Sequence, residues 1–214
     1  MIARADDWYI ALEGNIGAGK TTLAKKLAVD WEAIALLEHF EDNSFLPKFY
    51  QEPARYAFPL EMSLLAARFN QLKSRLPQSD LFAPRFIADY CLFKSLVFSR
   101  ITLEDDEYSL FHKMFGLIEP QIRKPDLIVY LHRPVNKLLI NIAKRGREYE
   151  SDIQPDYLEK LHEGYLDHFR TLENQAILII ELDGADFEEN YVLYGAIKEL
   201  IVRNYGTGIH KVRL

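Results

Sequence analysis

The 214-residue chain carries 26 basic and 32 acidic residues, and its formal net charge is −6. This balance, without any run of Lys and Arg, argues against a nucleic acid as a partner. The single cysteine, Cys91, excludes an intramolecular disulfide and a cysteine-based metal site. No apolar run is long enough to span a bilayer, which argues against a membrane protein.

The first seven residues are polar and lack the pattern of a signal peptide. No repeat, low-complexity stretch or flexible linker interrupts the sequence. We therefore expect a soluble, cytoplasmic protein with one domain over residues 1–214.

Short apolar segments alternate with segments of helical spacing along the chain. The expected strands cover residues 8–13, 33–38, 85–89, 127–131 and 176–180. The expected helices cover residues 22–28, 43–50, 56–76, 91–102, 104–123, 135–144, 157–172 and 187–201, and Pro77 is expected to stop the long one. This alternation predicts an α/β fold with a five-stranded, doubly wound parallel sheet and helices on both faces.

A glycine-rich loop follows the first expected strand, with the sequence Gly14-Asn15-Ile16-Gly17-Ala18-Gly19-Lys20-Thr21, which fits GxxxxGK[ST]. Glycines let backbone N–H groups approach phosphate oxygens, and the next helix presents its positive end to them. Lys20 would reach the β- and γ-phosphates, and the Thr21 hydroxyl would ligate Mg²⁺. The alternative is a turn that merely starts a helix, but the flanking strand and helix favour a P-loop NTPase-type site for ATP or GTP. The expected nucleotide-binding residues are Gly14, Asn15, Ile16, Gly17, Ala18, Gly19, Lys20, Thr21 and Thr22.

Two carboxylates end other expected strands, Glu38 the second and Asp89 the third. In open parallel sheets ligands bind beyond the carboxyl ends of the strands, so both acids and the P-loop should face one cleft. The alternatives are a solvated loop acid for Glu38 and a helix cap for Asp89.

With these residues in view, the chain resembles the deoxynucleoside kinase family over nearly its whole length. The segment from Glu38 to Tyr50 is similar to the family's strand-end glutamate and the helix with its sugar-binding tyrosine. The charged loop 145–150, Arg-Gly-Arg-Glu-Tyr-Glu, is similar to the family's lid, RxRxxE. A solvated loop with a charge pair at a helix end is the alternative for that loop.

The resemblance implies a homodimeric, ATP- and Mg²⁺-dependent kinase that phosphorylates the 5′-hydroxyl of a deoxynucleoside. It implies that Glu38 is the general base for that hydroxyl and that Tyr50 and Glu150 bind the 3′-hydroxyl. Thr21 and Asp89 would organise Mg²⁺. In a lid at about 145–151, Arg145 and Arg147 would close on the transferring phosphoryl group and neutralise its oxygens.

The first departure from the family pattern is Glu61, which stands where the family usually has a base-pairing glutamine. An ionised carboxylate only accepts hydrogen bonds, whereas guanine offers two neighbouring donors. We therefore predict a purine preference with a guanine-like edge, and adenine or cytosine would need an extra proton. The alternative is a glutamate on the helix surface.

The second departure is Tyr90, which follows Asp89 where the family commonly has an arginine. Without that cation we expect slower turnover unless the lid arginines compensate. Two other functions stay open: a nucleoside monophosphate kinase, although Glu38 would repel an acceptor phosphate, and a catalytically impaired nucleotide-binding regulatory module.

Overall fold

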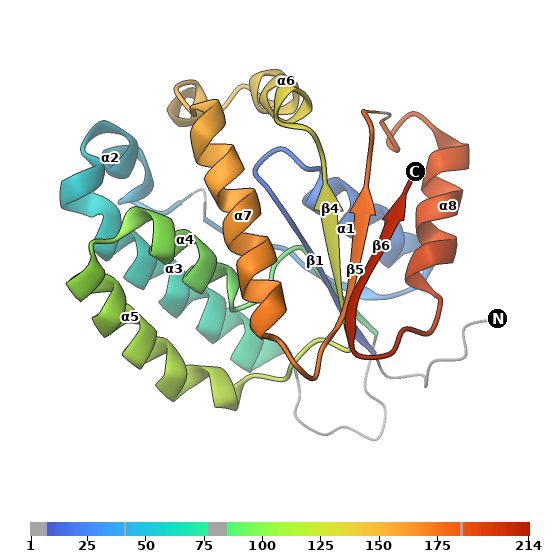
Figure 1. Cartoon of the computed structure of the whole chain (residues 1–214), viewed down its shortest axis with the longest axis horizontal. Coiled ribbons are helices and arrows are strands. Elements are labelled where there is room, and N and C mark those ends of the chain that lie inside the picture. Colours follow the sequence, from blue (N-terminus) through green and yellow to red (C-terminus); the bar gives the residue numbers. More distant parts are fainter. Residues whose placement is uncertain (1–7, 41, 77–84, 185) are drawn as a thin grey trace.

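The computed structural model describes residues 8–40, 42–76, 85–184 and 186–214. Its centre is a six-stranded, all-parallel sheet with the order β2-β3-β1-β4-β5-β6 (Figure 1). The strands are β1 (Tyr9–Gly14), β2 (Ile34–Leu36), β3 (Phe86–Ala88), β4 (Leu127–His132), β5 (Ala176–Glu181) and β6 (Gly208–Arg213). The expected helix stop at Pro77 and the N-terminal residues 1–7 lie outside the described residues.

The predicted α/β class and parallel sheet are confirmed, but the predicted count of five strands is wrong. The sixth strand, β6, pairs in parallel with β5 from Ala176 opposite Gly208 to Glu181 opposite Arg213. Its residues alternate between half-buried and exposed, as expected for an edge strand that is covered on one face. β6 therefore lacks the continuous apolar run by which the central strands were predicted.

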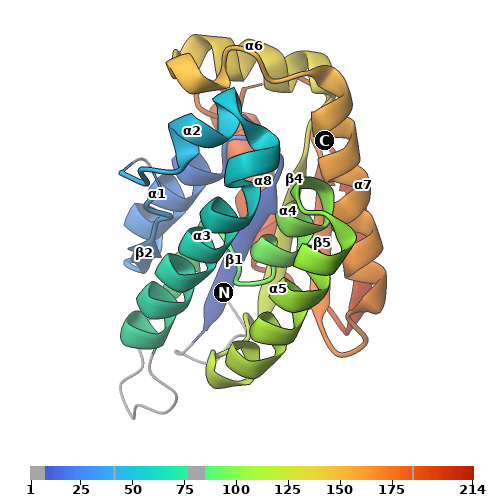
Figure 2. The ribbon, with the colours of Figure 1, turned by 90° about the vertical axis from the view of Figure 1, so that its left-hand side faces the viewer.

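Helices cover both faces of the sheet. They are α1 (Lys20–Asp30), α2 (Leu46–Gln51), α3 (Pro53–Arg75), α4 (Lys94–Thr102), α5 (Asp105–Ile118), α6 (Val135–Arg145), α7 (Pro155–Thr171) and α8 (Tyr191–Ile201), with short 3₁₀ turns η1 (Glu119–Gln121) and η2 (Glu148–Glu150). Figures 1 and 2 show α3, α4, α5 and α7 on one side of the sheet and α1 with α8 on the other. The expected helix 104–123 ends at Ile118, because Pro120 lacks the N–H group that a continuing helix needs.

The long helix α3 directs one stripe of side chains into the protein. The stripe consists of Ala57, Leu60, Glu61, Leu64, Leu65, Arg68 and Leu72. Their spacing of three, four and seven residues keeps them on one helix face. Two charged residues, Glu61 and Arg68, are thereby buried among apolar neighbours and face the carboxyl ends of the strands.

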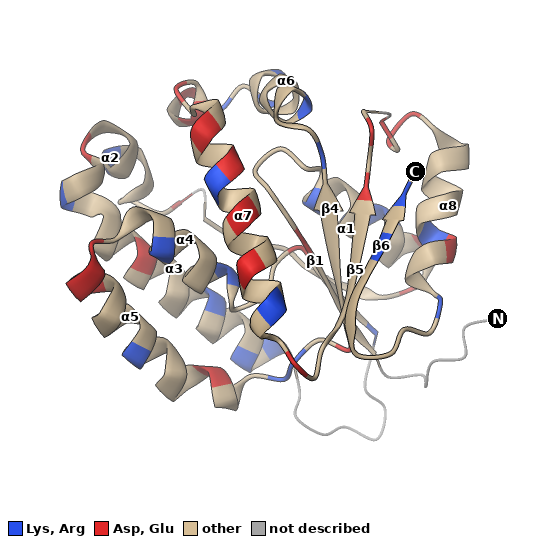
Figure 3. Ribbon diagram, viewed as in Figure 1, with Lys and Arg blue, Asp and Glu red and all other residues tan. Residues whose placement is uncertain are grey.

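Acidic and basic residues are interspersed on the surface, and acidic ones recur along α7 (Figure 3). Cys91 is buried. Within the ranges that the structure describes, none of the helices combines the length and apolar character of a membrane span.

Candidate active site

The glycines of the P-loop occupy backbone conformations that other residues rarely adopt. Gly14, Gly17 and Gly19 have φ angles of 149°, 79° and 93°. A Cβ atom at Gly14 would lie 2.7 Å from the Leu131 carbonyl oxygen, and one at Gly17 would lie 2.8 Å from that of Leu138. The loop therefore needs glycine both for its turns and for its close approach to β4 and α6.

Side chains from neighbouring elements fix the P-loop. The Asn141 side chain donates to the Gly17 carbonyl at 2.7 Å, and Arg133 Nε donates to the Ala18 carbonyl at 3.2 Å. Because these contacts come from α6 and from the end of β4, the loop is held in a preformed shape.

Lys20 bends back over the loop, where its Nζ donates to the carbonyl oxygens of Gly14 and Asn15 at 2.8 Å each. Burial and the positive charge of Lys94 lower the pKa of Lys20 to about 8, although the nearby carboxylates of Glu13 and Glu38 favour its charged form.

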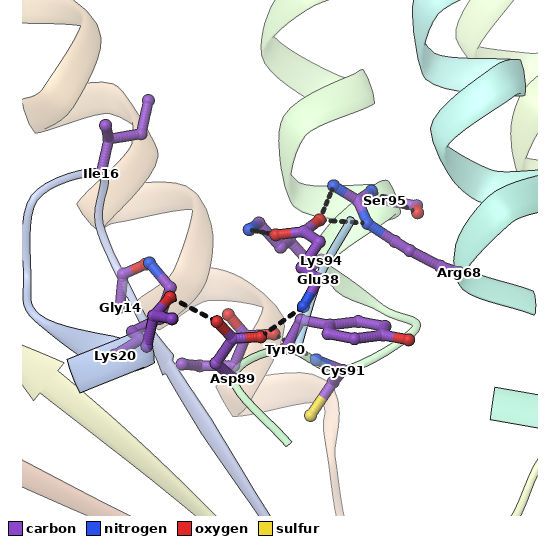
Figure 4. Close-up of polar contacts among 12 residues, drawn as sticks. Gly14, Ile16, Lys20, Glu38, Arg68, Asp89, Tyr90, Cys91, Lys94 and Ser95 are labelled. Atoms are coloured by element: carbon purple, nitrogen blue, oxygen red, sulfur yellow. Dashed lines mark hydrogen bonds and ion pairs between the residues drawn. The ribbon is translucent and has the colours of Figure 1, made fainter. Parts of the chain in front are cut away.

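Asp89 connects the P-loop helix to the end of β2. One of its carboxylate oxygens accepts a short hydrogen bond from the Thr21 hydroxyl, and the other accepts from the Glu38 backbone N–H at 2.7 Å (Figure 4). The alternative role as a helix cap is wrong, because α4 begins at Lys94 and has no side-chain cap. Asp89 and Thr21 together present the hard oxygen atoms that Mg²⁺ prefers.

Glu38 is buried, with 7% of its side chain exposed, so it is no solvated loop acid. Arg68 donates to its Oε1 atom through Nε and Nη2, each at 2.7 Å, and Lys94 Nζ lies 2.5 Å from Oε2 (Figure 4). Burial alone would raise the pKa of Glu38, but the charges and hydrogen bonds of Lys94 and Arg68 outweigh it and lower the pKa to about 2. Glu38 is therefore ionised at any physiological pH.

Glu61 is also buried, but its carboxylate has a different environment. Its Oε1 accepts from the Thr102 hydroxyl at 3.2 Å, and its Oε2 is buried without a hydrogen-bond partner among the described residues. Burial raises the pKa of Glu61 to about 7, against the opposing effects of Arg68 and Thr102. The alternative of a surface glutamate is wrong, since only 2% of the residue is exposed.

The expected lid follows α6, which ends at Gly146 in the left-handed conformation with φ 69°. Arg145 forms a short ion pair with Glu150, and Arg147 lies 3.4 Å from the same carboxylate. Glu150 is 4% exposed. The loop is therefore folded around a buried acid rather than fully solvated.

The lid also packs on α2, which carries the expected sugar-binding tyrosine. The Tyr149 ring stacks on the Tyr50 ring with 5.7 Å between their centroids, and the guanidinium of Arg147 lies 4.9 Å from the centre of the Phe40 ring. Burial and the Glu150 carboxylate raise the pKa of the Tyr50 phenol well above its usual range. Tyr50 and Glu150 thus lie in one neighbourhood, as the sequence predicted.

These side chains line two cavities that meet. The Glu38 cavity is lined by eleven of the predicted site residues: Ile16, Gly17, Lys20, Thr21, Glu38, Tyr50, Glu61, Asp89, Arg145, Arg147 and Glu150. The P-loop cavity is lined by residues 17–22, by Arg133, Asn141 and Lys144, by the two lid arginines, and by Asp186, Phe187 and Glu188 among others. Both are lined by Gly17, Lys20, Thr21, Arg145 and Arg147. Gly14 and Asn15 line neither of these two cavities, since both residues are buried at the start of the P-loop.

Sequence reasoning missed two cations of the Glu38 cavity, Arg68 and Lys94. The signal for Arg68 was its position seven residues after Glu61, which places both charges on one face of α3. The signal for Lys94 was a charged residue at the start of α4, directly after the apolar segment 91–93. Within the described part of the chain, no group of three or more His, Cys, Asp or Glu side chains is placed to hold a metal ion.

Comparisons with known proteins agree with this arrangement. A family model described as deoxynucleoside kinase matches residues 10–204. Deoxyguanosine kinase of Bacillus subtilis (strain 168) is 35% identical over 205 residues, which cover 91% of this chain and 98% of that protein. Deoxyadenosine kinase of Dictyostelium discoideum is 31% identical over 195 residues, which cover 89% of this chain and 78% of that protein.

A solved structure of deoxyadenosine kinase from M. mycoides with bound dCTP matches with a TM-score of 0.75. It is 20% identical in sequence, and the match covers 90% of this chain and 98% of that chain, so the two share a fold. The resemblance read from the sequence is confirmed. The chain therefore belongs to the deoxynucleoside kinase family and is a kinase.

Proposed function

We propose that this kinase transfers the γ-phosphoryl group of ATP to the 5′-hydroxyl of a deoxynucleoside and prefers a guanine base. The observation that carries the proposal is the junction of the two cavities, where the P-loop side faces the carboxylate of Glu38. Relatives named deoxyguanosine kinase in Bacillus subtilis and in Lactobacillus acidophilus support the purine preference.

On the donor side, Lys20 and the backbone N–H groups of the P-loop bind the phosphates. Arg145 and Arg147 line both cavities, so they are placed to neutralise the equatorial oxygens of the group in transfer. When Glu150 binds the substrate, its ion pairs with these arginines would couple closure of the lid to occupancy of the acceptor site.

Mg²⁺ fits Thr21 and Asp89, because the hydroxyl and carboxylate oxygens of these residues already meet and are hard ligands. Mg²⁺ commonly takes one or two protein oxygens and completes its shell with phosphate and water. When bound, it would neutralise charge on the phosphate oxygens.

On the acceptor side, Glu38 orients the 5′-hydroxyl and takes its proton. Its low pKa makes it a weak base, which is compatible with a loose transition state in which the bond to the acceptor oxygen is little formed. Removal of the proton then follows bond formation, and the main task of the carboxylate is to hold the hydroxyl in line.

Tyr50 and Glu150 are the proposed ligands of the 3′-hydroxyl. A carboxylate offers about four lone-pair sites, so Glu150 can accept from the sugar while it still accepts from Arg145 and Arg147. Stacking with Tyr149 fixes the Tyr50 ring on the same side of the cavity.

Glu61 is the proposed ligand of the base. Its unpartnered Oε2 atom is an acceptor in a buried place, and a buried acceptor without a donor is costly. The two adjacent donors of guanine would satisfy the ionised form. The protonated form donates and accepts as an amide does, which suits adenine or cytosine. Because the pKa of Glu61 is about 7, both forms are populated at neutral pH.

The test is ADP release with ATP and Mg²⁺ and each of the four deoxynucleosides, with deoxyguanosine monophosphate as a further acceptor. We expect turnover led by deoxyguanosine. Faster turnover with the monophosphate would favour a nucleoside monophosphate kinase. ATP binding without ADP release from any acceptor would favour the impaired regulatory module.

A homodimer in the cytoplasm remains the prediction for assembly and location. The apolar stripe of the long helix α3 is buried in the protein and so is not free to contact a second copy. Sedimentation equilibrium of the purified chain measures its mass in solution. Twice the chain mass of 24.9 kDa would support the dimer, and a single chain mass would contradict it.

A further inference from the structure

Tyr90 stands where a cation was expected, and its side chain brings no charge to the Glu38 cavity. The ring is fully buried, and its hydroxyl donates to the Gln71 side chain at 2.6 Å. Figure 4 shows this hydroxyl directed away from the Glu38 carboxylate. The buried charge that balances Glu38 must therefore come from other positions.

Lys94 supplies a positive charge in direct contact with the Glu38 carboxylate. It is the first residue of α4, four residues after Tyr90, and its Nζ is 2.5 Å from Glu38 Oε2. It lines the Glu38 cavity, and its ammonium group lies 5.4 Å from the centre of the Phe98 ring. Arg68 donates to the other oxygen of Glu38, and its Nη1 donates to the Ser95 hydroxyl at 2.7 Å. Both oxygens of the Glu38 carboxylate therefore have a cationic partner.

Two features of its location are unfavourable for Lys94. A lysine is almost never fully buried without a partner, and the side chain of Lys94 is only 9% exposed. A cation in the first turn of a helix also opposes the helix dipole, and α4 has no acidic residue there. The ion pair with Glu38 is the compensating contact, so the role of this lysine depends on that carboxylate.

The effect on Glu38 is large. Burial alone would raise the pKa of Glu38, and of the groups that lower it Lys94 is the strongest, ahead of Arg68. Without Lys94 the carboxylate would keep Arg68 as its only direct ion-pair partner among the described residues, and its Oε2 atom would lose the contact that fixes its direction.

We propose that Lys94 is a positioning residue for Glu38, which aims the carboxylate at the junction of the two cavities and supplies the buried positive charge that position 90 lacks. The proposal rests on the proposed function, in which Glu38 handles the acceptor hydroxyl. It predicts that loss of the arginine after Asp89 is compensated from within the acceptor site rather than by the lid alone.

The test compares Lys94→Met, which keeps length without charge, with Lys94→Arg, which keeps the charge. Lys113→Met, on the exposed side of α5, is the matched control. We expect Lys94→Met to lower kcat at least ~10-fold with little change in the KM for ATP, and to shift the acid limb of the pH profile of kcat/KM to higher pH. Lys94→Arg should restore much of kcat and the acid limb, and Lys113→Met should match the wild type.

Wild-type kcat and an unshifted acid limb in Lys94→Met would overturn the proposal. Equal losses in Lys94→Met and Lys94→Arg with unchanged thermal midpoints would also overturn it, because charge at this position would then not matter. If Lys94→Met fails to fold, kcat and the acid limb of Lys94→Arg are compared with those of the wild type. Values near the wild type would support the proposal, and a loss of kcat with an unchanged thermal midpoint would overturn it.

Failure of the proposed function would be recognised separately. If the wild type releases no ADP with any acceptor, the contact is still tested by the pH dependence of unfolding. Stability that depends on ionised Glu38 should then be lost at a higher pH in Lys94→Met than in the wild type. Coincident acid transitions would overturn the assigned role.

Discussion

The P-loop cavity and the Glu38 cavity are built in different ways. The P-loop cavity is built on the backbone of one continuous stretch, residues 17–22, whose glycines leave room for phosphate, and the end of β4, α6 and the lid add further arginines and lysines. The Glu38 cavity gathers charged side chains from six separate places: the start of α1, the ends of β2 and β3, the middle of α3, the start of α4 and the lid. The phosphate-binding loop of the first is local in sequence and general to nucleotide binding, whereas the second depends on tertiary packing and is the proposed acceptor site.

Within the Glu38 cavity, the pKa values of two buried glutamate side chains, Glu38 and Glu61, are shifted in opposite directions. Arg68 and Lys94 keep the pKa of Glu38 at about 2, whereas burial with few compensating contacts raises the pKa of Glu61 to about 7. One carboxylate is thus held charged, as the proposed role of Glu38 requires, and the other is balanced between an ionised and a protonated state, which under the proposal suit different bases.

The largest effect is expected from a substitution that disrupts the P-loop backbone. Gly14→Ala would bring a Cβ atom to 2.7 Å from the Leu131 carbonyl at a positive φ angle. We expect a loss of about 3 kcal/mol or more in the free energy of unfolding, together with loss of ATP binding. Urea unfolding and calorimetry measure the two. Gly116→Ala in α5, where a Cβ atom meets nothing within 4 Å, is the control and should not destabilise the protein. A stable Gly14→Ala protein with normal ATP binding would contradict the account.

The next prediction concerns the proposed acceptor site and leaves ATP binding unchanged. Glu38→Gln should lower kcat by ~10³-fold, because the amide cannot take the proton of the hydroxyl. Its Kd for ATP should stay near the wild-type value, since the P-loop is untouched. Steady-state kinetics and equilibrium binding give both quantities, with the exposed Glu199→Gln in α8 as control. Turnover within a factor of about two of wild type would refute the role of Glu38 as base.

A smaller loss is expected at the lid that joins the two cavities. Arg147→Ala removes one of two cations near the group in transfer, and Arg145 remains, so we expect kcat to fall about 10²-fold. Arg170→Ala, which breaks an exposed ion pair on α7, should leave kcat unchanged. An effect confined to the KM for the nucleoside would show that Arg147 serves binding rather than transfer.

The next prediction concerns the protonation state of Glu61 and its effect on base preference. In the wild type, the ratio of kcat/KM for deoxyguanosine to that for deoxyadenosine should rise by up to about 100-fold from pH 6 to pH 8, because the ionised fraction of Glu61 rises about tenfold while the protonated fraction falls about tenfold. Glu61→Gln should favour deoxyadenosine or deoxycytidine, with a ratio that no longer depends on pH. A flat wild-type ratio, or an unchanged preference in Glu61→Gln, would remove Glu61 from base recognition.

The last effect is on stability. The folded pKa of Glu61 lies above its ordinary value of 4.5, so the folded state binds the extra proton more tightly. Its contribution is fully present below pH 4.5 and is lost as the pH rises through about 7. Between these limits the wild type should lose at most about 3 kcal/mol relative to Glu61→Gln. Parallel stability curves for the two proteins in urea titrations from pH 5 to 8.5 would contradict this.

The sequence predicted what depends on local pattern. The GxxxxGK[ST] loop, the central strands and the strand-end acids Glu38 and Asp89 all follow from neighbours in the chain, and they were placed correctly. The edge strand β6 was missed because it is covered on one face only and pairs with a strand about thirty residues earlier.

The rest of the site depends on contacts that no local pattern encodes. Arg68 reaches Glu38 across 30 residues and Lys94 across 56, and both look like ordinary charges of amphipathic helices in the sequence. The carboxylate of Glu61 was expected to be ionised, but that assumption ignored its burial. Electrostatic state was the least predictable property, since it is set by packing.

The most direct test of the central claim identifies the product. Wild-type protein is incubated with deoxyguanosine, ATP and Mg²⁺ at pH 8, and the product is assigned by ³¹P NMR. The account predicts deoxyguanosine 5′-monophosphate in step with ADP, because Glu38 faces the junction of the cavities while Tyr50 and Glu150 lie by the lid. Phosphate on the 3′-oxygen, or inorganic phosphate alone, would contradict it.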